Sequence, residues 1–181
     1  MSTPKVIAIL LTLAATPALA QGYGFGKPAS AAEIRGWDID VRADGQGLPP
    51  GSGNATEGKV VYEQKCAACH GLKGEGSKIG ERLAGGQGTL KNPAPVKSIG
   101  SFWPYATTIF DYTRRAMPLN NPQTLTNDEV YALTAYILKL NGIIGAKDVM
   151  NAKSLPKVKM PNRDGFMQIW PGNIGPNKPL G

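Results

Sequence analysis

The chain has 181 residues, and its 20 Lys and Arg against 13 Asp and Glu give a formal net charge of +7. It contains two cysteines and a single histidine, which excludes a metal centre built from several histidines and a haem held between two histidines. A Ser-His-Asp triad would need the same histidine. The length predicts one folded domain, because a single core is adequate for about 100 to 200 residues.

Residues 1–20 are predicted to be an export signal. Lys5 gives a short positive start, residues 6–13 are almost entirely apolar, and Ala18-Leu19-Ala20 ends in the small-residue pattern that signal peptidase cleaves. A membrane anchor would need about 20 apolar residues, which is far more than this run contains. We therefore expect a soluble mature protein in the periplasm, without a membrane span.

Residues 21–54 and 142–181 are rich in Gly and Pro, and we expect them to form extended, irregular arms. A disordered linker is the alternative that this composition leaves open. Large apolar side chains argue against it, because burial of each contributes about 1.5 to 3 kcal/mol. We therefore expect the arms to wrap the core or a partner through Phe25, Ile34, Trp37, Ile39, Phe166, Ile169 and Trp170.

Residues 57–67 are predicted to form a helix capped by Thr56, and this helix leads into Cys66-Ala67-Ala68-Cys69-His70. This pentapeptide is the attachment sequence of a c-type haem, in which two thiols add to the vinyl groups and the next residue gives an imidazole to the iron. A disulfide and a redox-active dithiol are the alternatives, but no strand-helix-strand pattern surrounds the pair. We predict one covalent haem c on Cys66 and Cys69, with His70 as an iron ligand.

The next predicted helix begins at Pro104 and ends before Pro118, because proline fits a first helical turn and cannot continue an interior. We expect Tyr105, Ile109 and Tyr112 to share one face of this helix.

Met117 is the predicted second iron ligand. It lies in a loop-like context after a helix, far enough beyond His70 for the chain to pass from one haem face to the other. A thioether favours ferrous iron, and a haem with both axial positions filled only transfers electrons. Met160 is the main alternative, and Met150 and Met167 are weaker ones. For any single methionine, filling a gap in the core is the competing interpretation.

The last helix is the clearest one. Thr126 and Glu129 form a capping box, residues 130–140 carry apolar side chains at helical spacing, and Asn141-Gly142 supplies the stop. No segment of the sequence alternates between apolar and polar residues over a strand's length. The fold class is therefore predicted to be all-α, a small helical core around one haem.

Two stretches are strongly basic. Residues 65–97 carry six basic and two acidic residues, for a net +4, and residues 139–163 carry six and one, for a net +5. A basic surface attracts acidic partners and accelerates association. Ordinary solvated surface is the alternative. Nucleic acid is not an expected partner, because no basic helix with interleaved aromatic residues occurs.

The haem-attachment motif with its following Gly-x-x-Gly-Glu-Gly, the segment Leu83-Ala84-Gly85-Gly86 and Arg115-Ala116-Met117-Pro118 together resemble class I cytochromes c over residues 55–141. A closer resemblance, to the cytochrome subunit of sulfane dehydrogenase (SoxD) and to sulfite dehydrogenase cytochromes, extends into both arms. The segments that carry it are 36–42 (GWDIDVR), 48–53 (LPPGSG), 83–90 (LAGGQGTL), 102–106 (FWPYA), 130–136 (VYALTAY) and 160–166 (MPNRDGF).

The resemblance implies an electron-transfer subunit without catalytic residues of its own, and the single attachment motif indicates one haem. Its partner would be a molybdenum-cofactor dehydrogenase subunit that delivers electrons to the haem, and another cytochrome would be a downstream acceptor. A free-standing shuttle to a terminal oxidase and a haem sensor are the alternative functions. Two departures stand out: relatives often carry a second haem domain, and many have Pro where this chain has Glu81. In those relatives, a backbone carbonyl of that loop accepts a hydrogen bond from the N–H of the histidine ring. Which residue accepts it in this chain is left open by the sequence.

Overall fold

The computed structural model describes residues 25–167 and divides the chain into two units, 1–37 and 38–181. The predicted export signal and the apolar residues Ile169 and Trp170 lie outside the described residues. In the first unit, α1 (Ala31–Trp37) forms because Ser30 and Glu33 cap its start reciprocally. An irregular arm was expected here, and the local cap explains the difference. No residue of α1 is buried, and Trp37 is among its exposed side chains.

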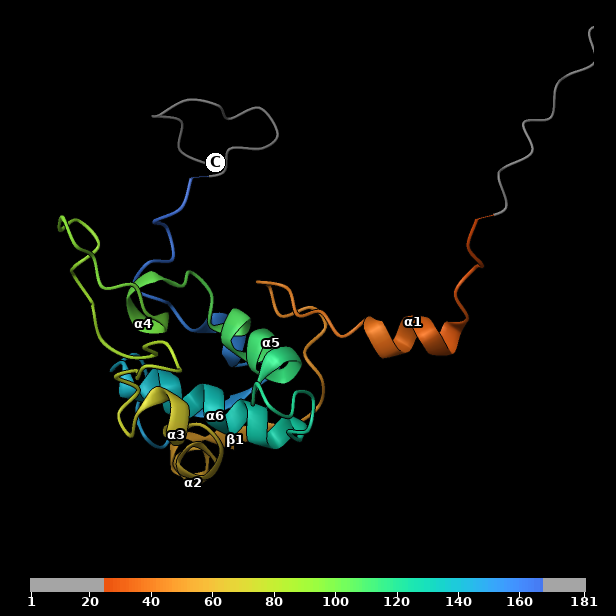
Figure 1. Cartoon of the computed structure of the whole chain (residues 1–181), viewed down its shortest axis with the longest axis horizontal. Helices are drawn as coiled ribbons and strands as arrows, with labels where there is room; N and C mark the ends of the chain where they lie inside the picture. The colour runs from red at the N-terminus through yellow and green to blue at the C-terminus, as the bar shows by residue number, and fades with distance from the viewer. Residues whose placement is uncertain (1–24, 168–181) are drawn as a thin grey trace, which may run out of the picture. The chain divides into compact units, whose positions relative to one another are not determined.

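The second unit is mostly helical, which confirms the predicted fold class, but it also contains a small sheet that the sequence did not predict. Figure 1 labels its elements in chain order. They are β1 (Ser52–Asn54), α2 (Ala55–Lys65), α3 (Ala67–His70), α4 (Ile99–Phe102), α5 (Ala106–Ala116), α6 (Asn127–Leu140), β2 (Val149–Asn151) and a 3-10 turn (Leu155–Lys157).

Helix α6 is the centre of this unit. Every residue from Val130 to Leu138 is buried, because α2, α5 and the sheet all pack on this helix. The predicted capping box is present: the hydroxyl of Thr126 accepts from the N–H of Glu129, whose carboxylate accepts from the N–H of Thr126. The predicted stop is confirmed as well, since Asn141 ends the helix.

Helices α2 and α6 approach each other until their backbones touch. A Cβ atom added at Gly58 of α2 would overlap the carbonyl oxygen of Ala132 on α6. In Figure 1, α2 is seen almost end-on against α6, so the two helices cross at a steep angle. Lys65 in the last turn of α2 donates to Glu129 of α6 at 2.7 Å, which ties the end of one helix to the start of the other.

The cap of α2 differs from the prediction. The helix begins at Ala55, and the side chain of Asn54 accepts from the N–H groups of Thr56 and Glu57. Thr56 therefore lies inside the first turn rather than at the cap. The helix ends at Lys65 rather than at residue 67, because the backbone changes direction at Cys66 before α3 begins.

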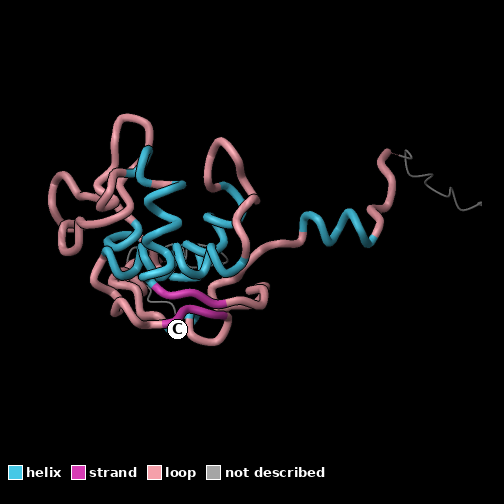
Figure 2. The backbone as a smooth tube through the Cα atoms, turned by 90° about the horizontal axis from the view of Figure 1, so that it is seen from below, coloured by secondary structure: helices cyan, strands magenta, loops and turns pink. Residues whose placement is uncertain are grey.

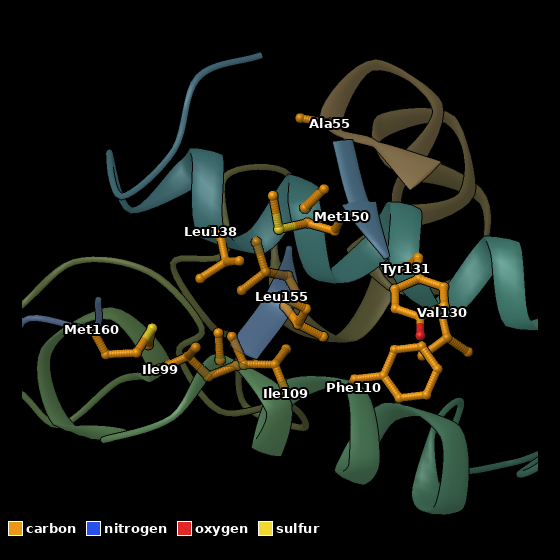
Figure 3. Packing of buried hydrophobic residues seen from close by; sticks show 13 residues of the cluster. Ala55, Ile99, Ile109, Phe110, Val130, Tyr131, Leu138, Met150, Leu155 and Met160 are labelled. Atoms are coloured by element: carbon orange, nitrogen blue, oxygen red, sulfur yellow. The ribbon is translucent and has the colours of Figure 1, made fainter. Parts of the chain in front are cut away.

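Both arms contribute to the fold of the second unit. Strand β1 pairs antiparallel with β2, with Gly53 opposite Met150, and Figure 2 shows the two strands side by side. Beyond β2, the side chains of Leu155 and Met160 enter the same buried cluster as Ile99 (Figure 3). The arms thus complete a core that residues 55–141 do not build alone.

Helix α5 packs its inner face against α6, with the ring centroids of Phe110 and Tyr131 4.4 Å apart. The predicted shared face is correct for Ile109, which is buried, and wrong for Tyr112, which is 50% exposed. Tyr112 instead packs edge-on against Trp103 on the segment before the helix. The short α4, capped by Ser98 and Ser101, was not predicted.

The Gly58 contact generates a stability prediction. Gly58→Ala should lower the free energy of unfolding of the haem-loaded protein by about 2 kcal/mol or more, because the new methyl group must push two backbones apart. Urea unfolding followed by circular dichroism measures this change. Gly145→Ala is the matched control, because the nearest atom to its Cβ would be at 3.4 Å. Equal midpoints for the two variants would contradict the proposed contact.

Candidate haem site

The attachment motif folds into a single turn after α2. The N–H groups of Cys69 and His70 both donate to the carbonyl oxygen of Cys66, at 3.1 and 3.0 Å. Cys66 is half-buried and Cys69 is exposed, and both thiols are free of disulfide bonds. The structure therefore brings Cys66, Cys69 and His70 together on one short piece of backbone.

The ring of His70 is oriented by the loop that follows it. Its Nδ1 lies 2.7 Å from the carbonyl oxygen of Glu81, and a carbonyl can only accept, so Nδ1 carries the proton. The other ring nitrogen, Nε2, is then the one with a lone pair for a metal. The acceptor of this hydrogen bond is thus the backbone carbonyl of Glu81, whose side chain is exposed.

The loop from Gly71 to Arg82 is folded back on the attachment turn by its own backbone. The N–H of Gly76 donates to the carbonyl of His70 at 2.8 Å, and the hydroxyl of Ser77 donates to the carbonyl of Cys69. A Cβ atom at Gly80 would lie 2.5 Å from the carbonyl oxygen of Cys69. Glycine at position 80 therefore allows the loop to come close enough for Glu81 to reach the histidine ring.

Tyr62 connects the turn to the helical core. Its hydroxyl donates to the carbonyl of Gly71 at 2.8 Å, and its fully buried ring packs on Tyr136 of α6 with centroids 5.1 Å apart. Burial raises the pKa of the Tyr62 hydroxyl above its ordinary value, so it remains a neutral donor over the working pH range. This role was not predictable from residue type, because a buried tyrosine is common in any core.

The acidity of Cys66 argues against a redox-active dithiol. Burial, opposed in part by the charge of Lys65, raises the pKa of the Cys66 thiol to about 11. Reactive dithiols show the opposite shift, because the thiolate is their nucleophile. The thioredoxin-like alternative therefore loses support.

The methionines lie in different environments. Met117 caps the end of α5, where its N–H donates to the carbonyl of Thr113 at 3.1 Å, and it is half-buried. Met160 is only 3% exposed and lies beside Ile99 in the core (Figure 3). Met150 is also buried in the core, and Met167 is exposed.

Large apolar side chains are exposed next to the predicted ligands. Leu72 and Ile79, on the loop after His70, are 67% and 75% exposed, and Leu119, just after Met117, is 79% exposed. A porphyrin is a large apolar plane, and it would remove such side chains from water. Together with two thiols, one imidazole nitrogen and one thioether, the residues present fit a covalently bound haem.

Asn141 locks the loop that contains the Leu-Ala-Gly-Gly segment. Its amide donates to the carbonyl of Leu83 at 3.1 Å and its oxygen accepts from the N–H of Gly85 at 3.0 Å. Gln87 also donates to Asn141, and Thr89 donates to the carbonyl of Gly86. Both side chains therefore help to hold this loop in its conformation.

Comparison with known proteins gives one family-model match, to "Cytochrome c", over residues 55–141. Among solved structures, the chain is similar to sulfane dehydrogenase SoxCD from Paracoccus pantotrophus, with 44% sequence identity and a TM-score of 0.75, over 81% of this chain and 72% of that one. A second structure is thiosulfate dehydrogenase TsdBA from Marichromatium purpuratum, with 26% identity and a TM-score of 0.35, over 50% of this chain and 20% of that one.

Across residues 25–167, none of the helices has both the length and the apolar character needed to cross a bilayer.

The Tyr62 contact generates a second prediction. Tyr62→Phe should lower the free energy of unfolding of the haem-loaded protein by about 1 kcal/mol, because the carbonyl of Gly71 loses its donor. Tyr112→Phe removes a hydroxyl from a half-exposed ring and should leave stability nearly unchanged. Urea unfolding of both variants compares them, and an equal loss in each would rule out a specific role for the Tyr62 hydroxyl.

Proposed function

We propose that this chain, which belongs to the class I cytochromes c and is close to the cytochrome subunit of sulfane dehydrogenase, is the periplasmic electron-accepting subunit or partner of a molybdenum-dependent sulfane or sulfite dehydrogenase. As a cytochrome c it carries covalent haem c and transfers electrons. The 44% identity to SoxCD supports the assignment of the partner, because it covers 81% of the chain and so extends beyond the residues that match the general family model.

The proposed attachment residues are Cys66 and Cys69, and the proposed iron ligands are His70 and Met117. The hydrogen bond from Nδ1 to the carbonyl of Glu81 supports His70, because it fixes the ring with Nε2 available. Met117 is half-buried at the C-terminal end of α5, which supports it as the second ligand. Met160, in contrast, would have to leave the core to reach a haem.

The haem, when bound, supplies a one-electron couple, and the chain's own residues set how that couple is used. With His70 and Met117 as iron ligands, the haem would have no open position for a small-molecule substrate to bind. Electron delivery by a protein partner needs no such position. His70 is held by the loop and Met117 by its helix end, so the ligands need little rearrangement when the charge of the site changes.

The surface around the attachment turn suits an acidic partner. Lys73, Lys78 and Arg82 are all exposed on the loop that runs from His70 past Glu81, and the exposed Glu75 and Glu81 reduce the net charge of this loop to +1. A net positive surface accelerates encounter with a negatively charged protein surface and would align it near the haem. This supports electron delivery from a protein partner to the side of the molecule that carries the attachment turn.

The ligand assignment predicts different effects for two methionine variants. Met117→Ala should abolish the thioether-to-iron charge-transfer band of the ferric protein and lower its reduction potential, because a thioether ligand stabilises ferrous iron. Met160→Ala should keep the band but lower the free energy of unfolding by about 2 to 5 kcal/mol, because it leaves a cavity in the core. Absorption spectra and urea unfolding measure both effects. A band that survives in Met117→Ala and disappears in Met160→Ala would transfer the ligand role to Met160.

The partner assignment predicts the composition of the native assembly. Purified gently from its own cells, the cytochrome should elute with a larger protein, and the complex should contain both haem iron and molybdenum. Size-exclusion chromatography with metal analysis tests this. Elution of the cytochrome alone near its own mass would favour a free-standing shuttle, and ready binding of carbon monoxide by the native ferrous protein would favour a haem sensor.

A further inference from the structure

Residues 39–43 of the N-terminal arm, here called the strap, run along the outer face of α5. The N–H of Val41 donates to Oδ1 of Asp111 at 2.9 Å, and the strap's Asp40 forms an ion pair with Arg115. Two weaker contacts lie at the ends of the strap, from Thr107 to the carbonyl of Ala43 at 3.4 Å and from Arg114 to the carbonyl of Ile39 at 3.5 Å. Thr107, Asp111 and Arg115 follow one another at intervals of four residues, and Arg114 is adjacent to Arg115, so the strap contacts one side of α5.

Asp111 is the central contact of this face. While Oδ1 accepts from the strap backbone, Oδ2 accepts from the guanidinium of Arg115 at 2.6 Å. The side chain of Asp111 is 15% exposed, so these charge-assisted hydrogen bonds are partly shielded from water. One carboxylate therefore joins the strap to the last turn of α5.

That last turn leads directly to Met117. The inner face of α5 is held by Ile109, Phe110 and Thr113, which are buried. Helix ends fray unless their backbone or side chains are tied down. At this end Arg115 is tied to both Asp111 and Asp40, two residues before the methionine. The strap thus restrains the outer face of the turn that positions the methionine.

We propose that Asp111 and Arg115 are positioning residues for the second iron ligand, and that the strap acts through them to keep the thioether of Met117 on the iron. This inference rests on the proposed ligand role of Met117. Loosening the strap leaves the methionine in the chain but makes it easier for another ligand to displace it from the iron.

The test uses the full-length, haem-loaded protein and imidazole as an external ligand that competes with Met117 for ferric iron. Asp111→Ala should tighten imidazole binding about tenfold, which corresponds to the loss of roughly one charge-assisted hydrogen bond. Asp40→Ala removes only the strap's ion pair with Arg115 and should shift the affinity in the same direction by a smaller factor. It also keeps the test available if Asp111→Ala fails to fold.

Glu63→Ala is the matched control, because it removes an ion pair of the same helical spacing, Lys59 with Glu63, from α2. It should leave imidazole affinity and the thioether-to-iron band unchanged. An unchanged imidazole affinity in both strap variants, or an equal change in Glu63→Ala, would overturn the role of the strap while the ligand assignment stands. Absence of the thioether band from the unmodified protein would instead overturn the proposed ligand, and this inference with it.

Discussion

The backbone contact between α2 and α6, at Gly58 and Ala132, is the constraint on which the haem site depends. It fixes the direction of α2, and α2 ends where the attachment turn begins. Tyr62 lies one turn after Gly58 on the same helix, and its hydroxyl donates to the carbonyl of Gly71. This hydrogen bond fixes the attachment turn relative to α2. The ring of His70 then has its orientation set by the loop folded back over it. The geometry of the attachment turn and of the His70 ring thus depends on the crossing of α2 and α6.

The second half of the site is built from the other side of α6. Helix α5 packs on it through Phe110 and delivers the chain to Met117. Both arms take part here, since the strap lies on the outer face of α5 and Met160 fills the core beside Ile99. The arms are therefore components of the fold in the region that the structure describes. A segment cut to the limits of the family model would lose both strands and three of the core's buried side chains, Met150, Leu155 and Met160.

Features encoded locally were predictable from the sequence. The capping box at Thr126 depends on two residues three positions apart, and the attachment motif on five consecutive ones. Features set by distant contacts were not. Asn and Thr are both favourable N-cap residues, so residue type alone does not choose between Asn54 and Thr56. Asn54 is the cap, and it is also the last residue of β1, which pairs with β2. Each strand has three residues, too few for an alternating pattern. The acceptor for His70 was open because a backbone carbonyl at Glu81 has no signature in residue type.

The side chain at position 81 is free to influence the reduction potential of a haem bound through His70. Because the imidazole is held by main-chain oxygen, the identity of the side chain at position 81 is independent of the ring's orientation. The carboxylate of Glu81 is exposed, so water and ions would weaken but not cancel its field at an iron bound to His70, the proposed ligand. Exchanging it for a neutral or cationic group would favour the reduced iron slightly without disturbing coordination. A single codon can therefore adjust the driving force for accepting an electron while the metal's geometry stays constant.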